Sequence, residues 1–200
     1  MARPPKYSSD QILDGVIEVV RRRGIGAVSA TGVAALLGAP SGSIYHRFPS
    51  RDALVASAWL RAGERFRGEL VAALEAPDPH AAALAAVRAT LDWARRRPAE
   101  ASFFLLYGKA ELTKNEWPPE VLRRASRFGN DLTDILRRFS MRLGGTSVAR
   151  IRFALVDVPQ AALRRALSSG AAIDSEAQSL VEETVVALLS AERPLSRMAS

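Results

Sequence analysis

The stretch SGSIYHRFPSRDAL occupies residues 41–54 and follows the apolar run VAALLG at residues 33–38. Ile44 and Phe48 are four residues apart, so they lie on one face of a helix and can anchor it to a neighbour. Pro49 ends that helix, because proline has no backbone N–H to donate to the preceding turn. The spacing therefore predicts two short helices joined by a tight turn, the second of which presents polar side chains outward.

Cap signals occur on both sides of this stretch. Ser8 followed three residues later by Gln11 is a capping-box pattern, and Gly38 is placed to form a left-handed C-cap. Serine is a favoured N-cap because its hydroxyl accepts a hydrogen bond from a free backbone N–H of the first turn. Serine N-caps are expected at Ser8, Ser29, Ser41 and Ser50.

These caps, with the proline and glycine stop signals between them, predict an all-α fold of about nine helices. The sequence contains no convincing strand pattern and no internal repeat. Pro159 lies inside the eighth predicted helix and is expected to kink it. The helices are expected at about residues 8–23, 29–37, 41–48, 50–76, 80–97, 99–113, 120–143, 147–169 and 174–191.

Arg21, Arg22 and Arg23 close the first predicted helix. Cations in the last turn interact favourably with the helix dipole, which accounts for the triplet without any partner. A contact with DNA phosphates is the alternative, and the sequence leaves both interpretations open.

The composition limits the classes of partner and compartment. The net charge of +7 favours a polyanionic partner such as nucleic acid or an anionic surface, although a general abundance of arginine explains it as well. With no cysteine, the chain has no disulfide and no thiolate chemistry. The first residues lack the apolar core of a signal peptide, and no stretch has the length and apolarity of a membrane span. A cytoplasmic protein is therefore expected.

An enzyme is not expected. His46 and His80 are the two histidines of the chain, and neither has a metal-binding or catalytic partner near it in the sequence. No glycine-rich phosphate loop follows a strand. We therefore expect no catalytic residues, no metal and no cofactor. A helical protein-interaction module, or a ligand-binding protein without specific DNA binding, is the alternative to a DNA-binding protein.

A helix-turn-helix reads DNA because its first helix braces the second, whose N-terminal residues enter the major groove. Arg47 can donate to a guanine or a phosphate, and the hydroxyl of Tyr45 and the guanidinium of Arg51 are candidate phosphate contacts. A half-buried core tyrosine and a solvated surface histidine are the alternatives for Tyr45 and His46. The brace is expected to consist of Val33, Ala34, Leu36 and Leu37.

The stretch contains a small residue, an aliphatic residue, tyrosine, two further residues and phenylalanine at positions 43–48, followed by Arg51 and Leu54. With Val28-Ser29, Val33-Ala34 and Gly38 before it, this signature resembles the TetR family of bacterial transcriptional regulators. The detailed match covers about residues 9–56. The resemblance implies a DNA-binding domain at residues 1–52, with the helix-turn-helix at about 29–48, and an effector-binding and dimerisation domain at residues 53–200.

The resemblance also implies a set of DNA contacts. Thr31 and Gly32 stand where family members often carry longer polar residues, and residues 40–42 are smaller and stiffer than the common polar trio. These departures put the operator sequence in question, rather than DNA binding itself. The implied contacts are Ser29 and Thr31 to phosphate, Ser41, Gly42 and Ser43 at base edges, and Tyr45, His46, Arg47 and Arg51 to phosphate or base.

A homodimer made by the last two helices is implied by the resemblance, and the sequence pattern agrees with it. Small and β-branched residues recur on one side of each helix, which lets helices approach closely. The alternative is that both faces belong to the core of a single chain. Two reading helices one turn of DNA apart, ~34 Å, would require a palindromic operator. The candidate interface residues are Ile151, Leu155, Ala162, Ala166, Val181, Thr184 and Leu188.

Aromatic residues are concentrated between the fourth and eighth predicted helices. An apolar pocket with few polar groups is the usual form of a small-molecule site, although ordinary core packing is the alternative for each residue. The resemblance implies that a small, largely apolar effector releases a repressor from its operator by shifting the population toward a second conformer. The candidate pocket residues are Trp59, Trp93, Phe103, Tyr107, Trp117, Phe128 and Asp157.

Overall fold

The computed structural model describes residues 7–107 and 117–190. These residues are helical and contain no β-strand, so the predicted all-α fold is confirmed. The chain divides into two compact units, each of which has most of its contacts within itself. Two long helices, α4 (Arg51–Leu74) and α8 (Pro119–Arg142), contribute residues to both units. Unit 1 comprises Met1–Arg65 with Arg97–Asn130, and unit 2 comprises Phe66–Arg96 with Asp131–Ser200. The assignment of residues 1–52 and 53–200 to two functional domains stays a prediction.

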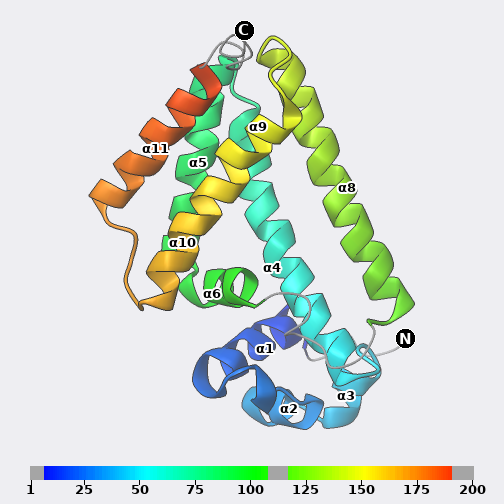
Figure 1. The fold of residues 1–200 in the computed structure, drawn as a ribbon. Helices are drawn as coiled ribbons and strands as arrows, with labels where there is room; N and C mark the ends of the chain where they lie inside the picture. Colours follow the sequence, from blue (N-terminus) through cyan, green and yellow to red (C-terminus); the bar gives the residue numbers. More distant parts are fainter. Residues whose placement is uncertain (1–6, 108–116, 191–200) are drawn as a thin grey trace, which may run out of the picture. The chain divides into compact units, whose positions relative to one another are not determined.

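Unit 1 contains the helix-turn-helix (Figure 1). In it α2 packs against α1 and α3 packs against α2. Its helices are α1 (Ser9–Arg23), the 3-10 turn η1 (Ile25–Ala27), α2 (Ala30–Leu37), α3 (Ser41–Tyr45), the first part of α4 (Arg51–Leu74), α6 (Pro98–Leu106) and the first part of α8 (Pro119–Arg142).

Unit 2 contains the remaining parts of α4 and α8 with four further segments. In this unit α11 packs against α5 and α10. Because α9, η2 and α10 form one continuous helix, the described residues make nine helices, as predicted. The further segments are α5 (Pro79–Arg96), α9 (Val148–Arg152) with the π-helical turn η2 (Phe153–Asp157) and α10 (Val158–Ser168), and α11 (Ser175–Ser190).

The predicted caps account for most of the helix boundaries. The Ser8 N–H donates to Gln11 Oε1 at 2.8 Å and the Gln11 N–H donates to Ser8 Oγ at 3.1 Å, which completes the capping box. Ser29 caps α2, and Gly38 ends it with φ +63°, in the left-handed region that glycine adopts without strain. Ser50 caps α4 by accepting a hydrogen bond from the Ala53 N–H.

The recognition helix differs from its predicted form. It ends at Tyr45, three residues before Phe48, and Pro40 rather than Ser41 occupies its N-cap position. Proline has no polar side chain to cap with, and the Ser43 hydroxyl donates to the Pro40 carbonyl instead. The Phe48 N–H still donates to the Ile44 carbonyl at 2.8 Å, so the chain keeps a helix-like turn up to Pro49.

One later helix is shorter than predicted, and another contains an irregular turn. The sixth was expected to reach residue 113, but α6 ends at Leu106 because Tyr107 has an extended backbone; residues 108–116 lie outside the described part. The helix containing Pro159 carries a π-helical turn directly before the proline. Since Pro159 has no N–H for the preceding turn, the regular α-helical bonding pattern cannot continue through it.

Candidate DNA-binding interface and associated sites

The second helix of the motif, α3, is anchored by apolar side chains. Ile44 is fully buried, at 0% exposure, and Phe48 is also buried, as the spacing predicts. Val33 and Ala34 of α2 are buried and brace it, whereas Leu36 is exposed and does not. Leu37 is partly buried against the same core. Burial of an isoleucine-sized side chain stabilises a fold by about 1.5–3 kcal/mol, so α3 is held firmly although it is short.

The outward side of α3 presents polar groups. Tyr45 is 50% exposed, and His46 and Gly42 are exposed beside it, while Ser41 is partly buried. Half of the surface of Tyr45 is thus exposed, while its neighbour Ile44 occupies the inward side. An exposed tyrosine hydroxyl and an exposed imidazole can both bond to phosphate oxygens or base edges.

Ser29 and Thr31 lie together at the start of α2. Ser29 Oγ accepts a hydrogen bond from the Gly32 N–H at 2.9 Å and lies 3.2 Å from Thr31 Oγ1. Thr31 is exposed. Ser29 thus has a structural role as N-cap, and the phosphate contacts of both residues stay predictions.

Arg47 has a partner within the chain that the sequence did not predict. Its Nη1 donates to the carbonyl of Tyr7 at 2.5 Å, and the hydroxyl of Tyr7 donates to the Gly38 carbonyl at 3.3 Å. Tyr7, which lies two residues before α1, is thereby tied to Gly38 at the end of α2 and to Arg47 just after α3. No short sequence pattern links positions 40 residues apart, and only the fold brings them together.

Arg51 is also engaged inside the chain. Its Nη2 donates to the Ile25 carbonyl at 2.8 Å, its Nε to the Val28 carbonyl at 3.2 Å, and its Nη1 to Asp52. These bonds hold the segment that precedes α2, which explains a cation at the N-terminus of α4 without invoking DNA. The predicted phosphate contact of Arg51 stays a prediction.

The arginines at the end of α1 form a local ion cluster. Arg21 donates both Nε and Nη2 to Glu18, and Arg22 donates to the same carboxylate. The hydrogen bonds from Arg21 and then Arg22 lower the pKa of Glu18 to about 2. Two of the three arginines therefore have an ion-pair partner within α1, and both the helix-dipole interpretation and the DNA contact stay predictions.

Five of the seven predicted pocket residues lie in unit 1. The ring of Trp59 packs 5.1 Å from that of Phe104 and 6.0 Å from that of Trp117, measured between centroids. The indole N–H of Trp59 donates to the carbonyls of Phe104 and Tyr107, both at 3.1 Å. A Cβ at Gly63 would lie 2.7 Å from a Phe104 ring atom, so glycine is needed there for the ring to contact α4. The five residues are Trp59, Phe103, Tyr107, Trp117 and Phe128.

The other two predicted pocket residues, Trp93 and Asp157, belong to unit 2. Asp157 is exposed, with its carboxylate 4.0 Å from Arg152 Nε. Trp93 is completely buried against Phe66. The indole N–H of Trp93 and the hydroxyl of buried Thr90, one turn earlier in α5, have no hydrogen-bond partner among the described residues. Thr90 was not predicted, although its position three residues before Trp93 on one helical face could have indicated it.

The predicted dimer residues divide into two groups. Ile151 and Leu155 are fully buried in the chain's own core, and Leu188 is partly buried. The other four, Ala162, Ala166, Val181 and Thr184, line a groove of about 510 Å³ between α10 and α11. Leu180 lines the same groove with 57% of its surface exposed. Leu180 was not among the predicted interface residues, although helical periodicity places it beside Ala177 and Thr184.

Among the described residues, every helix is too short or too polar to cross a lipid bilayer. No curated protein matches the chain. Residues 12–58, which run from α1 into α4, match the profile of the bacterial regulatory proteins of the tetR family.

Solved structures share the fold at low sequence identity. A transcriptional regulator from Rhodococcus sp. RHA1 has a TM-score of 0.73 at 18% identity, over 92% of this chain and 97% of that one. The fatty acid degradation regulator FadR from Bacillus halodurans has a TM-score of 0.72 at 18% identity, over 94% and 97%. FadR from Bacillus subtilis in complex with stearoyl-CoA has a TM-score of 0.71 at 15% identity, over 93% and 100%. Residues 12–58 thus match the helix-turn-helix region of the tetR family, and the described helices have the fold that solved regulators of that family share.

Proposed function

We propose that the protein is a non-enzymatic cytoplasmic repressor that binds a palindromic operator as a homodimer and is released by a small, largely apolar effector. The observation that carries the proposal is the recognition helix. Ile44 and Phe48 fasten α3 to the core while Tyr45 and His46 remain exposed. A rigid short helix with exposed polar groups is the form that major-groove recognition requires.

Within this interface we propose a division of labour. Tyr45 binds phosphate, and His46 with the short side chains of Ser41 to Ser43 reaches base edges. Arg47 and Arg51 use some of their donors inside the chain, so their contribution to DNA binding includes holding the motif in shape. Ser29 and Thr31 complete the phosphate contacts from α2.

The operator is the first thing to test. Fragments of the source genome selected on the protein should share a palindromic sequence, and affinity for it should fall steeply with salt. Each phosphate contact contributes a slope of about −0.9 in log K against log salt concentration, because binding releases condensed counterions. Filter binding or fluorescence anisotropy at several salt concentrations measures the slope. A flat response without sequence preference would contradict the proposal and favour a protein-interaction module.

We propose that a second copy of the chain covers the groove between α10 and α11. Apolar and small side chains dominate its lining, and Leu180 exposes more than half of its surface there. Exposed apolar surface is typical of homodimer contacts, and small side chains on the helices beside it let a partner helix pack closely. An isologous contact would place the same face of each copy against the other.

We propose that the effector carries an acyl chain and a hydrogen-bond acceptor, and that Trp93 and Thr90 bind the acceptor in unit 2. FadR from Bacillus subtilis, which shares the fold, was solved with stearoyl-CoA. A buried polar group without a partner costs about 1–3 kcal/mol. Two such groups, unpaired within the described residues, lie on one face of α5, and a bound ligand would offset their cost. A carboxylate or carbonyl oxygen bound there would accept from both donors.

Replacing Thr90 by valine separates ligand binding from structure. The hydroxyl is buried and has no partner among the described residues, so the variant should unfold at higher denaturant, with a gain of about 1 kcal/mol. Its affinity for stearoyl-CoA or stearate, followed by tryptophan fluorescence, should fall about fivefold to tenfold.

Ser140→Ala in the same unit is the matched control. The buried Ser140 hydroxyl already donates to the Thr146 carbonyl at 2.5 Å, so its removal should lower stability and leave acyl binding unchanged. Equal acyl affinity in wild type and Thr90→Val would show that Thr90 does not bind the effector.

A further inference from the structure

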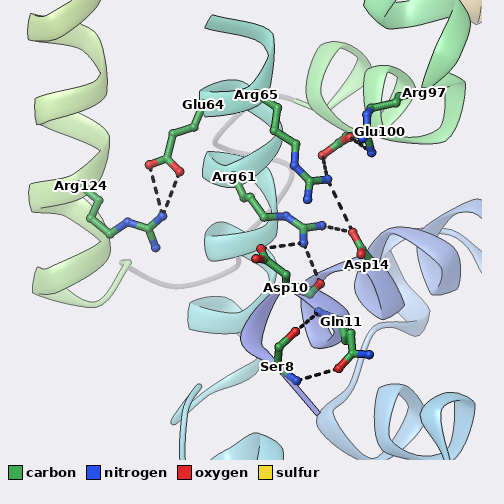
Figure 2. Close-up of polar contacts among 10 residues, drawn as sticks. All are labelled: Ser8, Asp10, Gln11, Asp14, Arg61, Glu64, Arg65, Arg97, Glu100 and Arg124. Carbon is green, nitrogen blue, oxygen red and sulfur yellow. Dashed lines mark hydrogen bonds and ion pairs between the residues drawn. The ribbon is translucent and has the colours of Figure 1, made fainter. Parts of the chain in front are cut away.

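Arg61 of α4 is a buried cation that holds the first turns of α1. Its side chain is only 8% exposed, and Nη1 donates to the carbonyl of Asp10 at 2.7 Å and to its carboxylate at 3.2 Å. Nη2 donates to the carboxylate of Asp14 at 2.5 Å. Figure 2 shows the guanidinium between the two aspartates. One side chain thus binds two successive turns of the helix on which the helix-turn-helix is built.

The ion pairs continue from Arg61 to α6. Arg65, one turn further along α4, donates to Glu100 at 2.9 Å and lies 3.7 Å from Asp14. Glu100 is only 5% exposed and also pairs with Arg97 at 3.6 Å (Figure 2). Charges alternate along the whole series, from α1 through α4 to the first turn of α6. A buried carboxylate that is paired with two cations is held firmly in place, because an unpaired charge in the protein interior costs free energy.

A second ion pair on α4 has the same chemistry but other neighbours. Glu64 accepts from Arg124 of α8 at 3.3 Å and 3.4 Å. In Figure 2 it lies on the side of α4 away from α1 and α6. It therefore joins α4 to another helix without touching α1, and it provides a natural control.

We infer that Arg61, Arg65 and Glu100 are positioning residues for DNA binding, which fix α1 and therefore the helix-turn-helix relative to α4 and α6. α2 packs against α1 and α3 packs against α2, so a shift of α1 moves the reading helix. The apparent affinity for DNA falls in proportion to the fraction of molecules in the competent conformation. Weakening this series of ion pairs lowers the fraction of competent molecules, although every side chain of α2 and α3 is still present.

This inference rests on the proposed operator binding, and its test uses mild substitutions in the full chain. Asp14→Asn changes an exposed carboxylate, and Glu100→Gln keeps the size and one acceptor of the buried group. Each should weaken operator binding about fivefold, equivalent to a competent fraction of about one fifth. Glu64→Gln should leave the affinity within about twofold of wild type, the scatter expected for a surface pair.

The salt dependence and the double variant distinguish positioning from direct contact. Because these residues act through α1, the log K plots should shift in parallel, whereas loss of a phosphate contact would change the slope by about 0.9. Both changes break the same series at Arg65, so Asp14→Asn with Glu100→Gln should weaken binding by less than the product of the single effects.

Amide hydrogen exchange supplies a readout that needs no operator. Exchange within α1 should be faster in Asp14→Asn and Glu100→Gln than in wild type, and unchanged in Glu64→Gln. Equal effects of Glu64→Gln and Glu100→Gln on affinity and exchange, or a changed salt slope, would overturn the inference. If the wild-type protein binds no specific DNA sequence, the proposed function is overturned. If the exchange rates nevertheless follow the expected pattern, the coupling of α1 to α6 still holds.

Discussion

Leu180→Glu should produce a monomer that binds the operator about 100-fold or more weakly than wild type. Leu180 is 57% exposed on α11 and lines the groove that we assign to the second copy. A carboxylate there would be buried without a partner at the interface, which opposes association strongly. The loss at the operator follows because one protomer reaches one half-site, and linked binding to two sites strengthens affinity by about 10²–10⁴.

Val186→Glu is the matched control for this change. Val186 is an exposed apolar residue of the same helix, at 47%, but it does not line the groove. Light scattering should give a dimer for Val186→Glu and a monomer for Leu180→Glu, with both folded by circular dichroism. If Leu180→Glu stays dimeric with full operator affinity, the second copy binds elsewhere.

Ile44→Ala should lower the free energy of unfolding by about 2–5 kcal/mol, the range for truncating a large aliphatic side chain in a core. Ile44 is completely buried and is one of the two anchors of α3. Because the helix has only five residues, little in its own backbone bonding can hold it once the anchor is lost. Denaturant unfolding followed by circular dichroism measures the loss.

The neighbouring residue should respond in the opposite way. Tyr45→Ala removes a half-exposed ring, so stability should change by less than about 1 kcal/mol. Operator affinity should nevertheless fall at least tenfold, since we assign the hydroxyl to phosphate and the ring to the interface. A large stability loss in Tyr45→Ala would show instead that the tyrosine is part of the core.

Much of the fold was predictable because its signals are local. The capping box of Ser8 and Gln11, the αL glycine at position 38 and the cap at Ser50 act within a few residues, and each forms as predicted. Errors arose where backbone chemistry competed with a side-chain signal. Ser41 is a good capping residue by type, yet the chain places Pro40 at the N-cap.

The candidate sites were less predictable because they depend on packing over long sequence distances. Trp93 and Trp59 are equally plausible pocket residues by type, but the indole N–H of Trp59 donates to two carbonyls, while that of Trp93 has no partner in the part of the chain that the structure describes. The residues that Arg61 joins are 47 and 51 positions away, and no spacing rule connects them.

The sequence by itself determined the helical class, the helix-turn-helix and its outward polar face, because caps, prolines and the Ile44–Phe48 spacing operate within one or two helical turns. Only the tertiary structure decided which polar side chains form hydrogen bonds or ion pairs within the chain. Arg47 and Arg51 bond to backbone carbonyls, and Arg61 and Arg65 bind α1. Hydrogen bonds and ion pairs of this kind depend on distances between helices, and those distances exist only once the core has formed.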